Sequence, residues 1–491
     1  MASELHKRNL ALETAISDSK FDDDGRPKRT GTLMTASAHI ITAVIGSGVL
    51  SLAWAIAQLG WIAGPMALMI FSFITGFTSS LLADCYRCST TGRRNYTYME
   101  VVKSNLGEMK CKLCGLAQYV NLVGTTIGYT ITASLSMVAI KRSNCFHKEG
   151  HDAGCHTSNN MYMIIFAIAE IILSQIPNFH ELSGLSILAA VMSFAYSSIG
   201  LGLAIAKITG QLPSLQFIVI IFYHIERGNH VTTSLTGVAI GVDVTSTEKI
   251  WSSLQAIGNI AFAYAYSIVL VEIQDTLRSS PPENKVMKRA SFVGVSITTI
   301  FYMLCGTLGY AAFGDKAPGN FLTGFGFYEP FWLVDFANMC IVVHLVGAYQ
   351  VFCQPIFTTV ENWCCHKWPE SGFVTKRHPI TFPSCGVCYV NMFRVIWRTV
   401  YVILTAVIAM LFPFFNSVIG LLGAIAFWPL TVYFPVEMYI SRAKIRKFSV
   451  TWMWLQVLSW TCFIVTLLAA AGSIQGLVKD LQTYKPFSSA S

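Results

Sequence analysis

Long apolar blocks constrain the fold of this chain more than any other feature. A helix that rises about 1.5 Å per residue needs about 20 mostly apolar residues to cross a bilayer core about 30 Å thick. Because 53% of the 491 residues are hydrophobic and only 12% are charged, the chain has too few charges to cover soluble domains. The sequence therefore predicts an all-α integral membrane protein with eleven transmembrane helices. The expected spans are 32–59, 62–83, 113–140, 161–176, 184–206, 250–272, 290–312, 330–360, 394–411, 416–439 and 452–476.

The lysines and arginines between these blocks predict the orientation of the chain. Cytoplasmic loops of membrane proteins carry an excess of Lys and Arg. With the N-terminus in the cytoplasm, the inside segments hold 24 of these residues and the outside segments hold 9. Eleven spans then leave the C-terminus outside the cell. Because topology explains the net charge of +8, the charge does not indicate a nucleic-acid partner.

Five segments follow from the order of the blocks. Residues 1–31 are charged, lack an apolar block, and are expected to form a solvated cytoplasmic tail rather than a signal peptide. Residues 32–206 and 250–439 each hold five spans, and residues 207–249 between them are expected to form an extracellular connector. Residues 440–491 supply the eleventh helix and a short C-terminal tail. Transporters built from two inverted repeats show this kind of division.

The cysteines fit the predicted orientation. Cys145 and Cys155 share one outside loop and are expected to form a disulfide, with two free thiols as the alternative. Three Cys-x-x-Cys pairs lie on the inside, where structural zinc is one interpretation and reduced thiols at the membrane interface are the simpler one. No metal site is predicted. These pairs are Cys85 with Cys88, Cys111 with Cys114, and Cys385 with Cys388.

Sequence signatures of catalysis are missing. The chain has no phosphate-binding G-x-x-x-x-G-K-[ST] loop. His180 and Glu181 begin a zinc-protease pattern, but Gly184 occupies the position of its second histidine. We therefore expect neither an enzyme nor a bound cofactor.

The middle of the first span is the first candidate binding site. There Ile45 is followed by Gly46, Ser47 and Gly48. Glycines at this depth allow the helix to unwind, and the freed N–H groups at the positive end of the second half-helix suit a carboxylate. Close packing between helices requires glycine equally, so both interpretations stay open.

The sixth span offers a second, weaker candidate. Small and aromatic residues alternate in its middle, from Gly258 and Asn259 to Tyr266 and Ser267. If each repeat has five helices, the first and sixth spans occupy matching positions, where inverted-repeat transporters place interrupted helices. Ordinary packing of Tyr264 and Tyr266 is the alternative.

Several stretches of the sequence look familiar, namely Gly31–His39, Ile45–Trp61, Ile176–His180, Phe262–Ser267, Ile273–Asp275, Gly309–Asp315 and His344–Phe352. They closely resemble plant amino acid permeases of the amino acid/auxin permease family, in the amino acid-polyamine-organocation superfamily. The resemblance implies a LeuT-type five-plus-five inverted repeat and proton-coupled uptake of a broad range of neutral and acidic amino acids at the plasma membrane. A non-transporting amino acid sensor, or a related auxin, proline or lysine/histidine carrier, is the alternative.

One segment departs from the family. Residues 212–226 insert an apolar run into the connector, where family members have a short glycine-rich link. The run is too short to span a bilayer. Because it leads toward the sixth span, it bears on whether this chain is competent for transport.

For a symporter, the two candidate breaks predict how an amino acid binds. Its carboxylate is expected on the backbone of residues 45–48. Its ammonium group is expected at carbonyls near Phe262 and Ala263, with Phe262 and Tyr266 shaping the side-chain pocket. The partners are therefore amino acids, protons and the lipid bilayer.

Ionisable residues inside spans are the candidates for proton coupling, because a charge at the bilayer centre costs at least ~2.5–3.5 kcal/mol. Histidine titrates closest to physiological pH. His39 is favoured, because it precedes Gly46 by seven residues and shares its face on a continuous helix. His344 is the second choice. The other candidates are Glu272, Asp335, Glu170 and Glu437.

Overall fold

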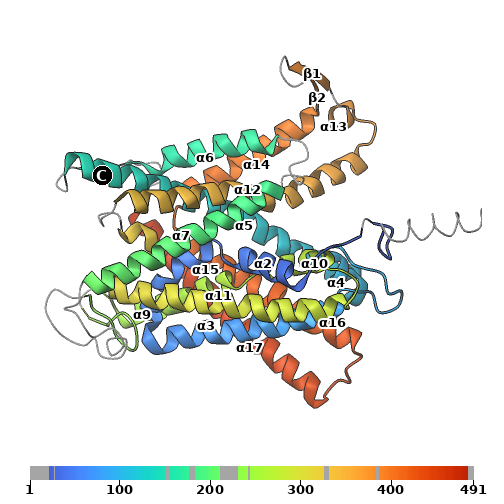
Figure 1. Cartoon of the computed structure of the whole chain (residues 1–491), viewed down its shortest axis with the longest axis horizontal. Helices are drawn as coiled ribbons and strands as arrows, with labels where there is room; N and C mark the ends of the chain where they lie inside the picture. Colours follow the sequence, from blue (N-terminus) through green and yellow to red (C-terminus); the bar gives the residue numbers. More distant parts are fainter. Residues whose placement is uncertain are drawn as a thin grey trace, which may run out of the picture.

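The computed structural model describes most of the chain as a bundle of long helices (Figure 1). The insert 212–226 lies outside the described residues, so its expected place in the connector stays a prediction. The described residues are 21–26, 28–150, 154–155, 157–175, 183–210, 231–241, 244–325, 331–376, 378–382 and 386–484.

Helices supply almost all of the regular structure. The first half contains α2 (Leu33–Val44), the 3-10 helix η1 (Ser47–Ser51), α3 (Leu52–Cys85), α4 (Tyr98–Leu106), α5 (Glu108–Glu149), α6 (Asn159–Ser174) and α7 (Ser183–Gly210). The second half begins with α9 (Ser246–Ala263), α10 (Ser267–Asp275), α11 (Glu283–Phe313), η3 (Gly314–Lys316), η4 (Phe321–Phe325) and α12 (Phe331–Lys367). It continues with α13 (Gly372–Thr375), the antiparallel hairpin β1 (His378–Phe382) and β2 (Gly386–Val390), α14 (Met392–Leu411), α15 (Phe415–Ala426), the π-helix η5 (Phe427–Tyr433), α16 (Phe434–Arg442) and α17 (Val450–Thr483).

Within the described residues, nine helices are long and apolar enough to cross a membrane. The apolar helices α2 and α6 are shorter than this limit. One of the nine, Ser47–Cys85, covers the end of the first expected span and all of the second, which meet at a break at Gly60. Each of the eleven expected ranges thus overlaps a described helix, and the number of actual crossings stays a prediction.

The break at Gly60 shows how the connector supports the helices. Gly60 has φ +80°, a conformation that glycine adopts without strain. Immediately after it, the N–H groups of Trp61 and Ile62 donate to the carbonyls of Ser234 and Leu235, both at 3.3 Å. These donors begin a helix and have no partner within it. The connector therefore replaces the missing acceptors.

The helices pack in two groups that lie one above the other in Figure 1. In the upper group, α12 packs against α5, α6 and α7, and α14 packs against α5 and α6. In the lower group, α11 packs along α3, and α9 packs against α15 and α17. The contacts of α15 with α5 and of α11 with α7 join the two groups.

The tail differs from its expected solvated form over its last described residues. Gly31 forms a parallel bridge with Leu277, and its N–H donates to Thr276 O at 3.0 Å. Arg29 makes ion pairs with Asp24 at 2.7 Å and with Asp275 at 3.0 Å. We call this contact of residues 21–31 with residues 84–95 and 275–283 the tail junction. The charges expected to hold this segment in water instead pair across the end of the bundle.

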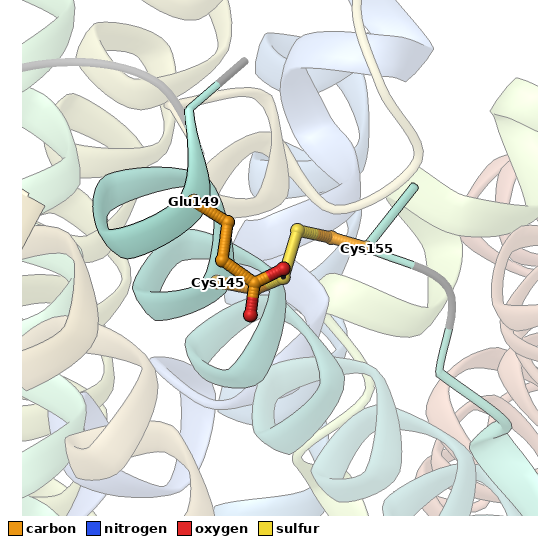
Figure 2. A group of neighbouring side chains, drawn as sticks. All are labelled: Cys145, Glu149 and Cys155. Atoms are coloured by element: carbon orange, nitrogen blue, oxygen red, sulfur yellow. Dashed lines mark hydrogen bonds between the residues drawn. A yellow bond between two sulfur atoms is a disulfide. The ribbon is translucent and has the colours of Figure 1, made fainter. Parts of the chain in front are cut away.

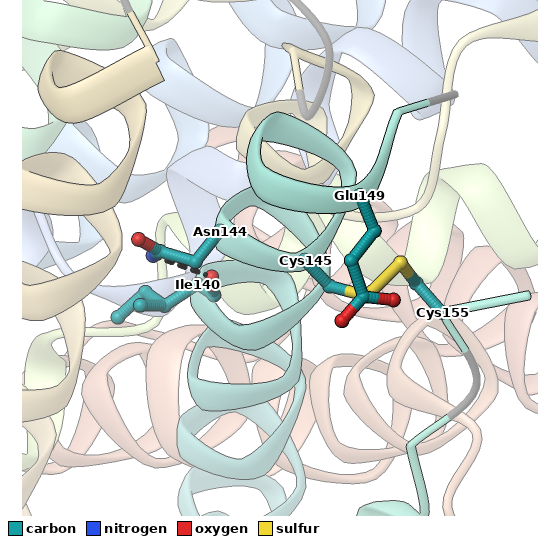
Figure 3. Close-up of a disulfide and its surroundings, with 5 residues drawn as sticks. All are labelled: Ile140, Asn144, Cys145, Glu149 and Cys155. Carbon is teal, nitrogen blue, oxygen red and sulfur yellow. Dashed lines mark hydrogen bonds between the residues drawn. A yellow bond between two sulfur atoms is a disulfide. The ribbon is translucent and has the colours of Figure 1, made fainter. Parts of the chain in front are cut away.

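Cys145 at the end of α5 forms a disulfide with Cys155 (Figures 2 and 3). Together with Glu149, these two residues form the one group in the described part of the chain whose atoms could surround a metal ion. Metal binding requires thiolates, and the disulfide occupies both sulfur atoms. The group is therefore a cross-link in this structure.

Candidate substrate site

The first helix is interrupted at Ile45 and Gly46. Helix α2 ends at Val44, Gly46 is extended with φ −131° and ψ −150°, and η1 begins at Ser47. The N–H of Gly46 turns back to donate to Val44 O at 2.9 Å. Since the first N–H groups of a helix have no acceptor within it, Ser47 and Gly48 present the donors at this break.

A second interruption separates α9 from α10. The helix ends at Ala263, and residues 264–266 connect it to α10 at Ser267. The carbonyl of Phe262 accepts from the N–H groups of Tyr264 and Ala265, the latter at 3.1 Å, which closes a tight turn. A carbonyl oxygen has two lone pairs, so both on Phe262 O are used, whereas Ala263 O accepts from the hydroxyl of Tyr302 at 3.1 Å and keeps one lone pair for another donor.

The two interruptions lie against each other at Gly48. A Cβ atom on Gly48 would lie 2.9 Å from Ala263 Cα and 3.4 Å from Phe262 Cδ1. Real Cβ atoms rarely approach other atoms that closely, so only glycine fits. The packing interpretation of this glycine pair therefore applies at Gly48.

Gly46 has a different environment. The nearest atom to a Cβ at this position is His344 Nε2, 4.0 Å away. A Cβ at Gly46 would therefore make only an ordinary van der Waals contact with His344 on α12. Two glycines two residues apart thus differ: Gly48 is required for close packing, whereas Gly46 has room for an added carbon beside His344.

His344 is buried and held in a fixed orientation. Its Nδ1 lies 2.8 Å from Ala189 O in α7, and the ring of Tyr196 packs edge-on against it. Because a carbonyl can only accept, Nδ1 carries a proton in this contact. In the neutral ring, Nε2 is then a hydrogen-bond acceptor beside Gly46. A hydrogen-bond or proton acceptor therefore lies at the first interruption.

Tyr302 joins the two interruptions and was missed at the sequence level. Its hydroxyl contacts the carbonyl of Val44, at the end of α2, and lies 3.1 Å from the carbonyl of Ala263, at the end of α9. Tyr302 is fully buried on α11. The available signal was a tyrosine in the middle of the expected span 290–312, because a buried phenol needs a hydrogen-bond acceptor.

The other proton-coupling candidates lie away from Gly46 or lack a contact with it. His39 is exposed on α2, and this helix ends before Gly46, so the assumption of a continuous helix that placed the two on one face does not hold. Glu272 is exposed on α10. Asp335 accepts from Asn144 Nδ2 at 2.6 Å, near the disulfide.

The remaining candidates are two aromatic residues of the expected pocket and two glutamates. Tyr266 is 2% exposed, whereas Phe262 is half-buried beside Gly48. Glu170 is fully buried on α6, where its Oε2 accepts from Gln350 Nε2 at 2.6 Å. Glu437 accepts from Gln456 on α17 at 2.8 Å.

Comparison with known proteins identifies relatives along nearly the whole chain. The profile of the family described as transmembrane amino acid transporter protein matches residues 29–479. Amino acid permease 6 of Arabidopsis thaliana is 67% identical over 478 residues, which cover 97% of this chain and 96% of that protein. Lysine histidine transporter-like 1 of the same plant is 29% identical over 461 residues, which cover 92% and 89%.

Two solved structures share the fold at low sequence identity. MhsT in complex with L-phenylalanine gives a TM-score of 0.53 at 11% identity, over 91% of this chain and all of that one. The inward facing conformation of Mhp1 gives 0.51 at 13% identity, over 94% and 93%. The LeuT-type fold class is thereby confirmed.

Proposed function

Because this chain belongs to the transmembrane amino acid transporter family, we propose that it is a proton-coupled symporter that imports neutral and acidic amino acids. The proposed location is the plasma membrane, with the N-terminus in the cytoplasm and the C-terminus outside. The meeting of two interrupted helices at Gly48 and Ala263, with His344 beside Gly46, is the observation that carries the proposal. Interrupted helices at membrane depth are tolerated where they line a cavity or are buried in protein.

The substrate is proposed to bind through its charged ends. Its carboxylate accepts hydrogen bonds from the N–H groups of Ser47 and Gly48, at the positive end of η1 and α3. Its ammonium group donates to the remaining lone pair of the Ala263 carbonyl, at the end of α9. The half-buried ring of Phe262 borders the substrate side chain, whereas the buried Tyr266 supports the turn behind it.

His344 is the proposed site of proton coupling, in preference to His39. Its Nε2 lies close enough to Gly46 for the charge on the imidazole to act on a bound substrate. A proton moving through 100 mV supplies about 2.3 kcal/mol, which corresponds to roughly 50-fold accumulation. His39 is exposed and lacks a comparable link to the interruption.

Uptake measurements test this proposal. Labelled alanine and glutamate are supplied at pH 5 and pH 7.5 to permease-deficient yeast that express the chain. We expect faster uptake at pH 5, loss of uptake in Gly46→Val, and loss of the acid stimulation in His344→Ala but not in His39→Ala. Gly76→Val is the matched control, because a Cβ at Gly76 meets no atom within 4 Å.

The sensor alternative gives a different result. A non-transporting sensor would bind amino acids and show no uptake at either pH, with normal amounts of protein at the cell surface. A carrier selective for auxin, proline or lysine and histidine would transport those compounds and leave alanine and glutamate outside.

A further inference from the structure

A cavity of about 550 Å³ lies at the disulfide end of the bundle, apart from the two interruptions. Its walls come from the last turns of α5, the segment around Cys155, residues 319–323, and Phe415 at the start of α15. None of the lining residues belongs to α2, η1, α9 or α10. Ligand pockets commonly measure about 300–1,000 Å³ and have mostly apolar walls with a few polar groups.

Two of the lining side chains bring hydrogen-bond donors to this cavity. Arg142 on α5 is exposed and is the one charged residue among the described residues of the wall. Asn320 is 4% exposed, and its Oδ1 accepts from the N–H of Leu322 at 3.1 Å. This contact fixes which end of the amide is nitrogen, and Nδ2 has no hydrogen-bond partner in the described part of the chain.

The chemistry of these groups indicates an anionic ligand. A buried donor without an acceptor is costly, so the wall at Asn320 favours a ligand that supplies an oxygen. The guanidinium of Arg142 matches a carboxylate in shape and charge. The apolar lining residues Leu135, Val138 and Ala139 suit a small uncharged side chain.

We propose that this cavity is an accessory site for the carboxylate of a free amino acid, separate from the substrate site at Gly46. The choice of an amino acid as the ligand rests on the proposed function, whereas the choice of a carboxylate rests on Arg142 and Asn320. Asn320 directly precedes η4, and η4 contacts η1 at the first interruption. A ligand held between Arg142 and Asn320 therefore links α5 to a segment that contacts the first interruption.

Saturation binding to the full-length protein in lipid nanodiscs tests the proposal, with labelled L-alanine as the probe. The wild-type chain is expected to show two classes of sites. Arg142→Gln and Asn320→Asp each weaken one class at least ~10-fold, which corresponds to about 1.4 kcal/mol. Arg142→Lys keeps the charge and restores part of the affinity. Lys141→Gln removes the neighbouring exposed cation, which is not among the lining residues, and leaves both classes unchanged.

Competition and a second variant separate the failure modes. Gly46→Val is expected to lose the other class and to keep the class that depends on Arg142. Propionate, which lacks an ammonium group, displaces alanine from the Arg142-dependent class. A single class in the wild-type chain, unchanged binding in Arg142→Gln, or displacement by equal concentrations of chloride overturns the accessory site. If wild-type cells show no uptake while the Arg142-dependent class persists, the proposed function fails and the accessory site stands.

Discussion

The meeting point of the interrupted helices and the tail junction consist of different chemical groups. At the meeting point, the groups are backbone N–H and carbonyl groups, the hydroxyl of Tyr302 and the imidazole of His344. At the tail junction, Arg29 pairs with Asp22, Asp24 and Asp275, and the side chain of Arg29 is 8% exposed. The first region uses uncharged dipoles, and the second uses full charges.

The bilayer explains this difference. An ionised side chain in the hydrocarbon core costs several kcal/mol, whereas the backbone dipoles at helix ends provide partial charges without an ionised group. At the end of the bundle, several opposite charges lie close together and stabilise one another in ion pairs. The meeting point of the interrupted helices can therefore rearrange without separating charges, whereas release of the tail requires that ion pairs break.

Gly48→Val is expected to have the largest effect on transport, because it separates the two interruptions. The added side chain collides with Ala263 backbone and side-chain atoms. Overpacking costs about 1–3 kcal/mol, so transport is expected to fall by up to roughly 100-fold and the melting temperature to fall as well. Uptake and thermal unfolding of the purified protein measure the two effects. Normal stability and uptake would show that the helices do not need this close contact.

Arg29→Ala is expected to have a smaller effect on transport, because it acts at the tail junction. Removing one partner of buried ion pairs costs about 3–5 kcal/mol at the junction, so the tail is expected to detach while the two interruptions stay in contact. Limited proteolysis of inside-out membrane vesicles measures cleavage after Lys28. Lys28→Ala removes an exposed cation nearby and serves as the control. Because this variant lacks the trypsin site, both variants are also digested with a protease that does not cleave after lysine. Unchanged protection of the tail in Arg29→Ala would contradict the ion-pair account.

The two regions are expected to respond differently to a fall in pH. Hydrogen bonds from Arg29 lower the pKa of the Asp24 carboxyl below its ordinary 3.8. Burial raises the pKa of Asp22, but hydrogen bonds from Arg29 and the charge of Arg94 outweigh it, so this pKa is also lowered. Lowered carboxyl pKa values stabilise the junction above pH 3.8 and lose this effect only as the pH falls further.

Between pH 7.5 and pH 5, therefore, the tail should stay attached while uptake rises. Protease protection and alanine uptake, measured on the same membranes at both pH values, check this expectation. Release of the tail in step with faster uptake would assign the acid response to the junction instead of His344.

Cys88→Ser is expected to have the smallest effect on uptake. Labelling of Cys88 in the wild-type chain shows on which side of the membrane the tail junction lies. Hydrogen bonds with Thr90 and Thr91 lower the pKa of this thiol to about 6, so it is mostly thiolate at pH 7.5. A membrane-impermeant maleimide should label Cys88 in inside-out vesicles and spare it in intact cells, and Cys88→Ser should keep normal uptake. Labelling in intact cells would reverse the predicted orientation.

Periodicity and composition determined the class of this protein. The apolar blocks predicted helices at the observed places. Backbone N–H and C=O groups without partners are costly in lipid, and a helix pairs them all within one segment. The glycines at positions 46 and 48 also indicated an interruption in the middle of the first span. These inferences need only local sequence.

The tertiary structure decided which candidates meet. The sequence favoured His39, because seven residues place two side chains on one face of an unbroken helix, and the helix ends at Val44. His344 and Tyr302 come from α12 and α11, about 300 and 260 residues away in sequence, and only helix packing brings them to the interruption. The burial of the tail likewise depends on ion-pair partners that lie far along the chain. Local sequence determines where a helix can form or break, whereas contacts between distant segments depend on the packing of the whole bundle.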